Sequence, residues 1–286
     1  MTQIDQFESV FRSAVKAVFE YTTIDIANIL VVTDLDQEAA RLFQKKVQDF
    51  LQYPEVRTER NYSIITGDAY ASTNDLLELL NQHTPDLICT YRNLHSNAWR
   101  FPHSLGEHLD VMLQKTDIPI MVLPHPKANY QAEHALLDTT DVMVVTNLLA
   151  VDDRLINYAA AFTKPDGNLY LTHVEDLQVF ERYMDAISKI DIIDTETARK
   201  RLAEQLLKEP EDYFNSCMDV LQQHYPQLLV RSLVTFSHLV TEYRHQIESR
   251  KLDLLVLSSK DECQHAMQSV AYPLAVELRQ IPLLLL

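Results

Sequence analysis

Short apolar runs rich in β-branched residues alternate along the chain with longer segments in which apolar residues recur every three or four positions. This alternation is typical of an α/β protein with a parallel sheet. The short runs predict strands at 28–33, 61–66, 86–90, 118–123, 141–146, 168–174, 228–234, 253–257 and 281–286. The longer segments predict helices at 36–51, 73–82, 104–115, 153–162, within 177–224, at 238–250 and within 262–279.

Several strand sequences occur twice in the same order, which indicates an internal duplication. NILVVTDL resembles DVMVVTNL, PDLICTYR resembles LDLLVLSS, and DIPIMVL resembles QIPLLLL. The second copy contains an additional strand, NLYLTHV, and a long polar helical stretch. We therefore predict an N-terminal helix, a shortened first domain, a linker and a second domain, with bounds at 1–22, 23–124, 125–140 and 141–286.

Composition restricts the classes of function. The net charge of −16 disfavours binding to nucleic-acid phosphates or to anionic lipid. No apolar run is long enough to span a bilayer, and the N-terminus lacks the basic and apolar regions of a signal peptide. The three cysteines have neither metal-site nor disulfide spacing. We expect a cytoplasmic protein with no nucleic-acid or membrane partner.

Glycine is scarce, with three residues in the chain against roughly 7% in average usage. Phosphate cradles need several glycines, because backbone N–H groups must approach the phosphate closely. Neither a G-x-G-x-x-G nor a P-loop motif occurs. A G-x-S-x-G elbow is also absent, and His95, His103 and His108 lack the i,i+4 spacing of helical metal ligands. We therefore predict no catalytic residues and no metal site.

Four motifs in this order resemble the universal stress protein family in its tandem two-domain form. They are VVTD or VVTN after the first strand, LTHVED at the end of the second, a DLIV-type fourth strand, and a last strand opened by Ile-Pro. The resemblance implies two doubly wound parallel-sheet domains of strand order 3-2-1-4-5. The first domain would lack strand 2, because nothing in the first half matches LTHVED.

The resemblance also implies where a nucleotide would bind. Family members use an aspartate after strand 1, backbone at the end of strand 2, and a loop of the form G-x-x-G, nine residues, then G-[ST] after strand 4. If a nucleotide binds this chain, the corresponding cofactor-binding residues are Asp34, Thr146, Asn147, Val174, Ser258 and Lys260.

The second half departs from that glycine pattern. Its three glycine positions hold Ser258, Asp261 and Ala271, and the last position holds Tyr272. Side chains there obstruct the approach of phosphate to backbone N–H groups, and a carboxylate would repel it. The strand-1 acid is also replaced, by Asn147.

In the first half, the first two glycine positions hold Tyr91 and Leu94. Gly106 lies nearby, out of register and followed by an acid. Asp34 is retained there, but the second strand is not. Trp99 and Phe101 occupy this loop, either filling the vacated pocket or forming an exposed apolar contact. Neither half holds a complete family site.

We therefore expect a non-catalytic protein without a cofactor that acts in stress response or regulation by binding an unidentified protein partner. The first alternative is an ATP- or AMP-binding protein that uses the second domain. The second is an α/β enzyme whose site lies between the two halves.

Two expectations concern assembly. The apolar strands at 118–123 and 281–286 should pair antiparallel and join both halves into one sheet, because an unpaired apolar edge promotes aggregation. An apolar stripe at 4–19 predicts a leading helix that covers the sheet of the first half or, alternatively, joins two copies in a homodimer.

Overall fold

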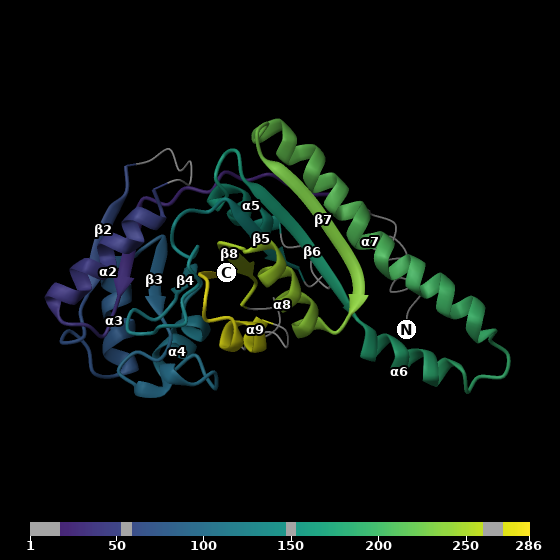
Figure 1. Cartoon of the computed structure of the whole chain (residues 1–286), viewed down its shortest axis with the longest axis horizontal. Helices are drawn as coiled ribbons and strands as arrows, with labels where there is room; N and C mark the ends of the chain where they lie inside the picture. Colours follow the sequence, from purple (N-terminus) through teal and green to yellow (C-terminus); the bar gives the residue numbers. More distant parts are fainter. Residues whose placement is uncertain (1–17, 53–58, 147–152, 260–270) are drawn as a thin grey trace, which may run out of the picture.

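The computed structural model describes residues 18–52, 59–146, 153–259 and 271–286, which form a mixed sheet with helices on its faces (Figure 1). The strands are β1 Asn28–Val32, β2 Asn61–Ile65, β3 Leu87–Tyr91, β4 Ile120–Leu123, β5 Asp141–Val145, β6 Asn168–Asp176, β7 Leu229–Ser237, β8 Leu254–Leu257 and β9 Leu283–Leu285. The helices are α2 Gln37–Phe50, α3 Thr73–His83, the 3₁₀ turn η1 Asn97–Arg100, α4 Glu107–Lys115, α5 Asp153–Phe162, α6 Leu177–Ile187, α7 Thr195–His224, α8 Leu239–Arg250 and α9 Ala271–Glu277.

Within the described residues the strand order is β2-β1-β3-β4-β9-β8-β5-β6-β7. The second half therefore has the doubly wound order 3-2-1-4-5, which confirms the predicted α/β fold. The described part of the first half has four strands, and β2 pairs directly with β1 in the place that β6 takes beside β5. This corrects the prediction that the first half lacks strand 2: among the described residues, the outer third position is the one without a strand, because β2 lies at the sheet edge.

The two halves meet where β4 and β9 pair antiparallel, as the sequence predicts. The register places Met121 opposite Leu284 and Val122 opposite Leu283. These four side chains are fully buried, so the apolar edges are covered on both faces. All other strand pairs in the described sheet are parallel.

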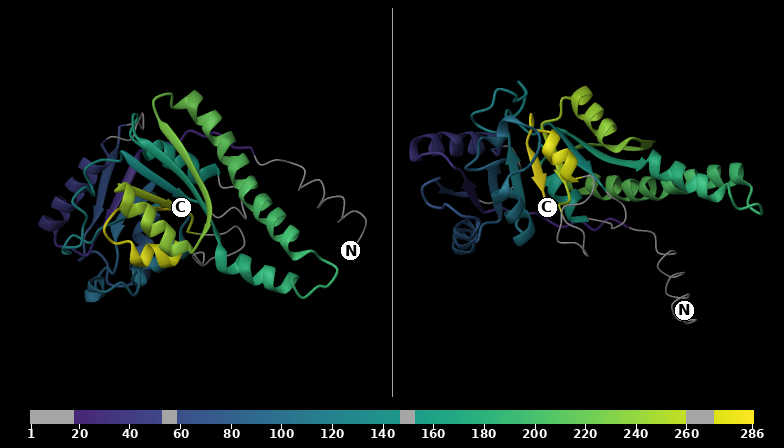
Figure 2. Two further views of the ribbon diagram at one scale, coloured as in Figure 1. Left: turned by 45° about the vertical axis from the view of Figure 1, so that its right-hand side comes forward. Right: turned by 90° about the horizontal axis from the view of Figure 1, so that it is seen from below.

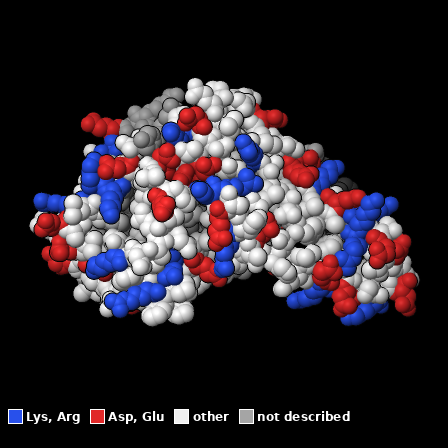
Figure 3. Space-filling model, viewed as in Figure 1, with Lys and Arg blue, Asp and Glu red and all other residues white. Residues whose placement is uncertain are grey.

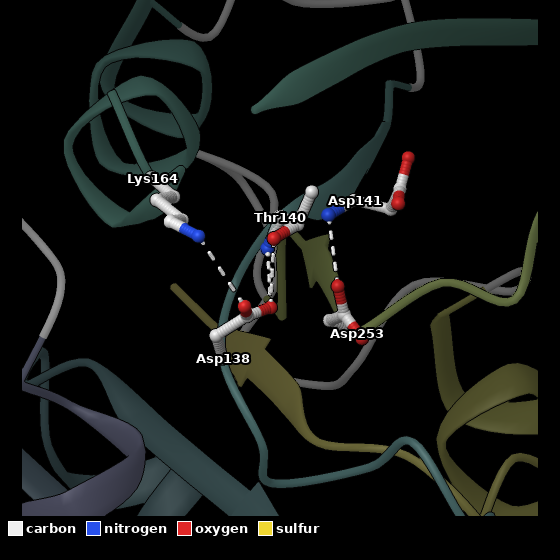
Figure 4. A network of polar contacts seen from close by, with 5 residues as sticks. All are labelled: Asp138, Thr140, Asp141, Lys164 and Asp253. Atoms are coloured by element: carbon white, nitrogen blue, oxygen red, sulfur yellow. Dashed lines mark hydrogen bonds and ion pairs between the residues drawn. The ribbon is translucent and has the colours of Figure 1, made fainter. Parts of the chain in front are cut away.

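One aspartate lies just before β3 and another lies just before β8. Each accepts hydrogen bonds from the backbone at the amino end of the neighbouring strand. Asp86 Oδ2 accepts the backbone N–H groups of Ala27 and Asn28 at 3.0 and 2.8 Å. Asp253 Oδ2 accepts the N–H of Asp141 at 2.9 Å (Figure 4). Asp86 and Asp253 therefore lie at the amino ends of the strands. The resemblance would place a nucleotide at the opposite, carboxyl ends.

The linker ends in a local network that leads into β5. Asp138 accepts from both the N–H and the hydroxyl of Thr140, at 3.1 and 2.8 Å, and pairs with Lys164 at 3.6 Å (Figure 4). An Asp side chain that accepts the N–H two residues later holds a turn, which directs the chain into the strand.

Residues 18–22, where the described part of the chain begins, pack on the second half. The Phe19 N–H donates to Ser216 Oγ on α7 at 3.1 Å, and the Tyr21 ring stacks on His224 with centroids 3.6 Å apart. Residues 18–22 are not helical, so the predicted helix does not reach residue 22. The stripe at 4–17 lies outside the described residues.

The helices α6 and α7 extend beyond the sheet as an arm at one end of the molecule (Figures 1 and 2). They are the polar stretch that distinguishes the second half in sequence. The C-terminal part of α7 covers the sheet through Tyr213, Phe214, Cys217 and Leu221, all buried. The rest of the arm carries exposed apolar side chains, which include Val179, Tyr183, Ile190, Ile192 and Leu202.

Candidate functional site

The carboxyl ends of β1 and β3 hold a closed hydrogen-bond network around Asp34. The Tyr91 hydroxyl donates to Asp34 Oδ1, and the same phenol oxygen accepts from the Asp34 N–H at 3.1 Å. Thr33 Oγ1 lies 2.7 Å from that oxygen and accepts the Leu35 N–H at 3.1 Å. The His95 N–H donates to Asp34 Oδ2 at 3.0 Å. Both carboxylate oxygens of Asp34 therefore have donors from within the chain.

The loop after β3 folds back over this acid. Asn93 and His95 both adopt left-handed backbone angles, φ 59° and 55°, which non-glycine residues seldom use. Asn93 N–H donates to the Leu105 carbonyl at 2.8 Å. A Cβ on Gly106, whose φ is 93°, would lie 2.6 Å from the Asn93 Cα. The retained glycine thus allows two parts of the loop to touch, rather than exposing N–H groups to a phosphate.

Aromatic rings fill the space around the network. Tyr70 packs edge-on against His95 and His108, with centroids 4.7 and 5.4 Å away. Trp99 stacks on His125 at 4.6 Å, and His125 packs against Tyr91 at 4.7 Å. Trp99 therefore packs against a buried ring of the described structure. The other aromatic of the loop, Phe101, is 58% exposed.

Burial controls the protonation of these groups. It raises the pKa of the Tyr91 hydroxyl, and the hydrogen bond to Asp34 raises it further. Burial also raises the pKa of Tyr70, as does the nearby Asp34 charge. His125 is buried, which lowers its pKa to about 4. At neutral pH, both hydroxyls are protonated and the His125 ring is neutral, so the network contains no activated phenolate.

The second half brings its candidate residues to the ends of three adjacent strands. Thr146 follows β5, Val174 lies near the end of β6, and Ser258 follows β8; β5 pairs with both neighbours. The Thr146 N–H donates to the Thr172 carbonyl at 3.1 Å. Val174 is buried and Ser258 is partly buried. Asn147 and Lys260 lie outside the described residues, and Asp34 belongs to the other half.

The histidine of LTHVED is a structural residue here. His173 Nδ1 lies 3.2 Å from the Thr146 carbonyl, and Nε2 lies 3.0 Å from Glu175 Oε1. Both ring nitrogens are therefore engaged, which fixes the orientation of the imidazole between the ends of β5 and β6. The motif thus has a local role in joining these two strand ends.

No group of three or more His, Cys, Asp or Glu side chains in the described residues could hold a metal ion. His95 and His108 nevertheless come close, with ring centroids 5.5 Å apart. Their separation in sequence gave no signal of this contact, because the irregular loop after β3 brings them together. His103 instead stacks on Phe101, with centroids 5.8 Å apart.

Comparison with known proteins gives likenesses in structure alone. No family model and no curated protein matches the sequence. A universal stress protein from Archaeoglobus fulgidus is 14% identical, with a TM-score of 0.48 over 91% of this chain and 87% of its own. The chain resembles the universal stress proteins. A putative universal stress protein from Pseudomonas aeruginosa UCBPP-PA14 is 11% identical, with a TM-score of 0.46 over 91% of this chain and 93% of its own.

A functionally unknown protein from Pseudomonas aeruginosa PAO1, PA1789, is similar to the same extent. It is 11% identical, with a TM-score of 0.48 over 91% of this chain and 92% of its own.

Among the residues that the structure describes, no helix has both the length and the apolar character needed to cross a bilayer. On the face drawn in Figure 3, basic and acidic side chains are interspersed.

Proposed function

We propose that this chain is a non-catalytic tandem universal stress protein whose nucleotide sites are degenerate. It acts in the cytoplasm through binding to a protein partner, in stress response or in regulation. The observation that carries the proposal is the closed network at Asp34. The acid that would meet the nucleoside in the family already accepts from Tyr91 and His95.

A nucleotide would have to open this network before it could bind the first half. It would displace the Tyr91 hydroxyl, whose oxygen also accepts the Asp34 N–H. It would also displace the ring of Trp99 from its stack on His125. Leaving a buried donor or acceptor without a partner costs about 1–3 kcal/mol for each group, so opening the site is unfavourable.

In the second half, three residues with side chains stand where the family loop has glycine: Ser258, Asp261 and Ala271. The loss of three charge-assisted hydrogen bonds, at about 1.5 kcal/mol each, reduces affinity by roughly three decades. A micromolar triphosphate site would become millimolar, so ATP would not be retained. The net charge of −16 adds a modest, salt-dependent repulsion.

The test is denaturing extraction of the purified full chain, followed by mass spectrometry of the released small molecules. We expect no ATP, ADP or AMP at a substantial fraction of one molecule per chain, and no ATP hydrolysis above a buffer control. Stoichiometric AMP or ATP would instead support the nucleotide-binding alternative. Turnover of another substrate, lost on substitution between the halves, would support the enzyme alternative.

A further inference from the structure

Four buried polar atoms gather where the loop after β3 meets the segment between α9 and β9. They belong to Arg92, His125, Tyr130 and Arg279, which we call the Arg92 cluster. Within the described part of the chain, Arg92 Nη1, His125 Nε2, the Tyr130 hydroxyl and Arg279 Nε are all buried without a hydrogen-bond partner. Buried polar atoms are seldom left in this state, so each one calls for an explanation.

Arg92 is the innermost member of the cluster and links the two halves. Its side chain is 1% exposed, and its Nε and Nη2 donate to the carbonyls of Ala275 and Leu278, each at 2.7 Å. These carbonyls lie at the C-terminal end of α9, the end of a helix that favours a cation. The third nitrogen, Nη1, has no such acceptor.

Arg279 and Tyr130 form the outer part of the cluster. The Arg279 guanidinium lies 4.5 Å from the centre of the Tyr130 ring, and its Nη1 donates to the Trp99 carbonyl at 3.2 Å. Burial lowers the pKa of Arg92 to about 10, and the Arg279 charge contributes to that shift. Arg92 is therefore still cationic at neutral pH, and the Arg279 guanidinium is close enough to act on its charge.

His125 supplies a further donor. Its Nδ1 accepts the Lys127 N–H at 3.2 Å, which leaves the ring proton of the neutral imidazole on Nε2. The ring also stacks on Trp99, whose carbonyl accepts from Arg279. The histidine is thus part of the same contiguous group of side chains as the two arginines.

Within the described residues, the titratable groups that shift the pKa of Arg92 are Tyr130 and Arg279, and neither is a carboxylate. A buried cation without a counter-charge is costly, and an oxyanion is a ligand that would both balance the charge and accept hydrogen bonds from these donors.

We propose that the Arg92 cluster binds a small oxyanion, a phosphate or carboxylate group, between the two halves of the protein. Arg92 and Arg279 supply charge, while Tyr130 and His125 donate neutral hydrogen bonds. Tyr130 and Arg279 are partly exposed, which gives the anion access from solvent. His125 also packs against Tyr91, but the proposed function rests on the hydrogen bonds of Asp34 and not on this cluster.

The experiment titrates the full chain with sodium phosphate at an ionic strength held constant with sodium chloride, and follows thermal unfolding. We expect a saturable rise in Tm with a midpoint of about 1 mM or below. Arg279→Gln should raise that midpoint at least about tenfold, which is 1.4 kcal/mol of binding free energy. Tyr130→Phe keeps the ring beneath Arg279 and should weaken binding as well. Sodium acetate, titrated in parallel, distinguishes a carboxylate ligand from a phosphate.

Arg41→Gln is the matched control, because it removes the same charge from an exposed position on α2. It should leave the midpoint unchanged. A Tm that does not respond to either anion would overturn the proposal. So would an equal response in wild type, Arg279→Gln and Tyr130→Phe. Either result would leave the ATP experiments unaffected, because those concern Asp34 and the loop after β8.

Discussion

The Tyr91 hydroxyl donates a hydrogen bond to the Asp34 carboxylate across a sequence separation of 57 residues. By the sequence resemblance, Tyr91 stands at the first glycine position of the universal stress protein loop, and Asp34 at the acid that follows strand 1. The side chain at the glycine position therefore hydrogen-bonds the retained acid.

Tyr91→Phe tests the energetic value of this contact. The change leaves the Asp34 N–H and the Thr33 hydroxyl without their acceptor. We expect the free energy of unfolding to fall by about 1–3 kcal/mol in urea titration. Tyr183→Phe, on the exposed arm, is the matched control and should change it by less than about 0.5 kcal/mol. Equal effects of the two substitutions would mean that the network contributes nothing to stability.

The sequence predicts the strands well, because the apolar runs of the inner strands are buried on both faces, although those of the outermost strands β2 and β7 are only partly buried. Both apolar edge strands and their antiparallel pairing follow from that reasoning. Asp36 opens the helix expected at 36–51 and caps it, since its carboxylate accepts the N–H groups of Glu38 and Ala39. Local signals suffice for such features.

The contacts of the candidate site are not readable in the same way. Tyr91 and Asp34 meet through sheet topology, and Arg92 meets the α9 carbonyls across the two halves. The contact of Phe19 with Ser216 on α7 is equally unreadable, because an apolar residue indicates that a surface will be covered, but not which surface.

Asp253→Asn tests a pH-dependent contribution to stability. Burial raises the pKa of Asp253 to about 6, above its value of about 4 in the unfolded chain. The folded state therefore binds the proton more tightly, and stability from this group is present below pH 4 and lost as pH rises to 6. The difference between the two pKa values corresponds to about 2–3 kcal/mol of folding stability.

We expect Asp253→Asn to gain stability relative to wild type as pH rises from 4 to 6 in denaturant titrations. Asp86→Asn is the matched substitution, since Asp86 accepts the equivalent N–H groups in the first half. The difference in the free energy of unfolding between wild type and Asp253→Asn should change between pH 4 and pH 6. A constant difference would contradict the assignment.

The two described cysteines should be unreactive in the native protein. Burial raises the pKa of Cys89, and it raises that of Cys217 to about 12. The thiolate is the reactive form, so iodoacetamide at pH 8 should label neither until the chain unfolds. Peptide mass spectrometry after labelling, with and without urea, gives the measurement. Rapid native labelling of Cys217 would mean that α7 opens from the sheet.

Phe19→Ala tests the attachment of the N-terminal segment to the second half. Phe19 is 3% exposed, and its replacement should reduce the free energy of unfolding by about 3 kcal/mol. The adjacent Val18 is 62% exposed, so Val18→Ala should have an effect below about 0.5 kcal/mol. If the two variants unfold at the same urea concentration, this segment is not part of the packed structure.

Titration calorimetry of ATP into the full chain tests the degenerate-site account most directly. The account predicts no binding with a dissociation constant below about 50 µM, which corresponds to roughly −6 kcal/mol. Binding tighter than that, abolished by Asn147→Ala or Lys260→Ala, would contradict it and establish the second half as a nucleotide site.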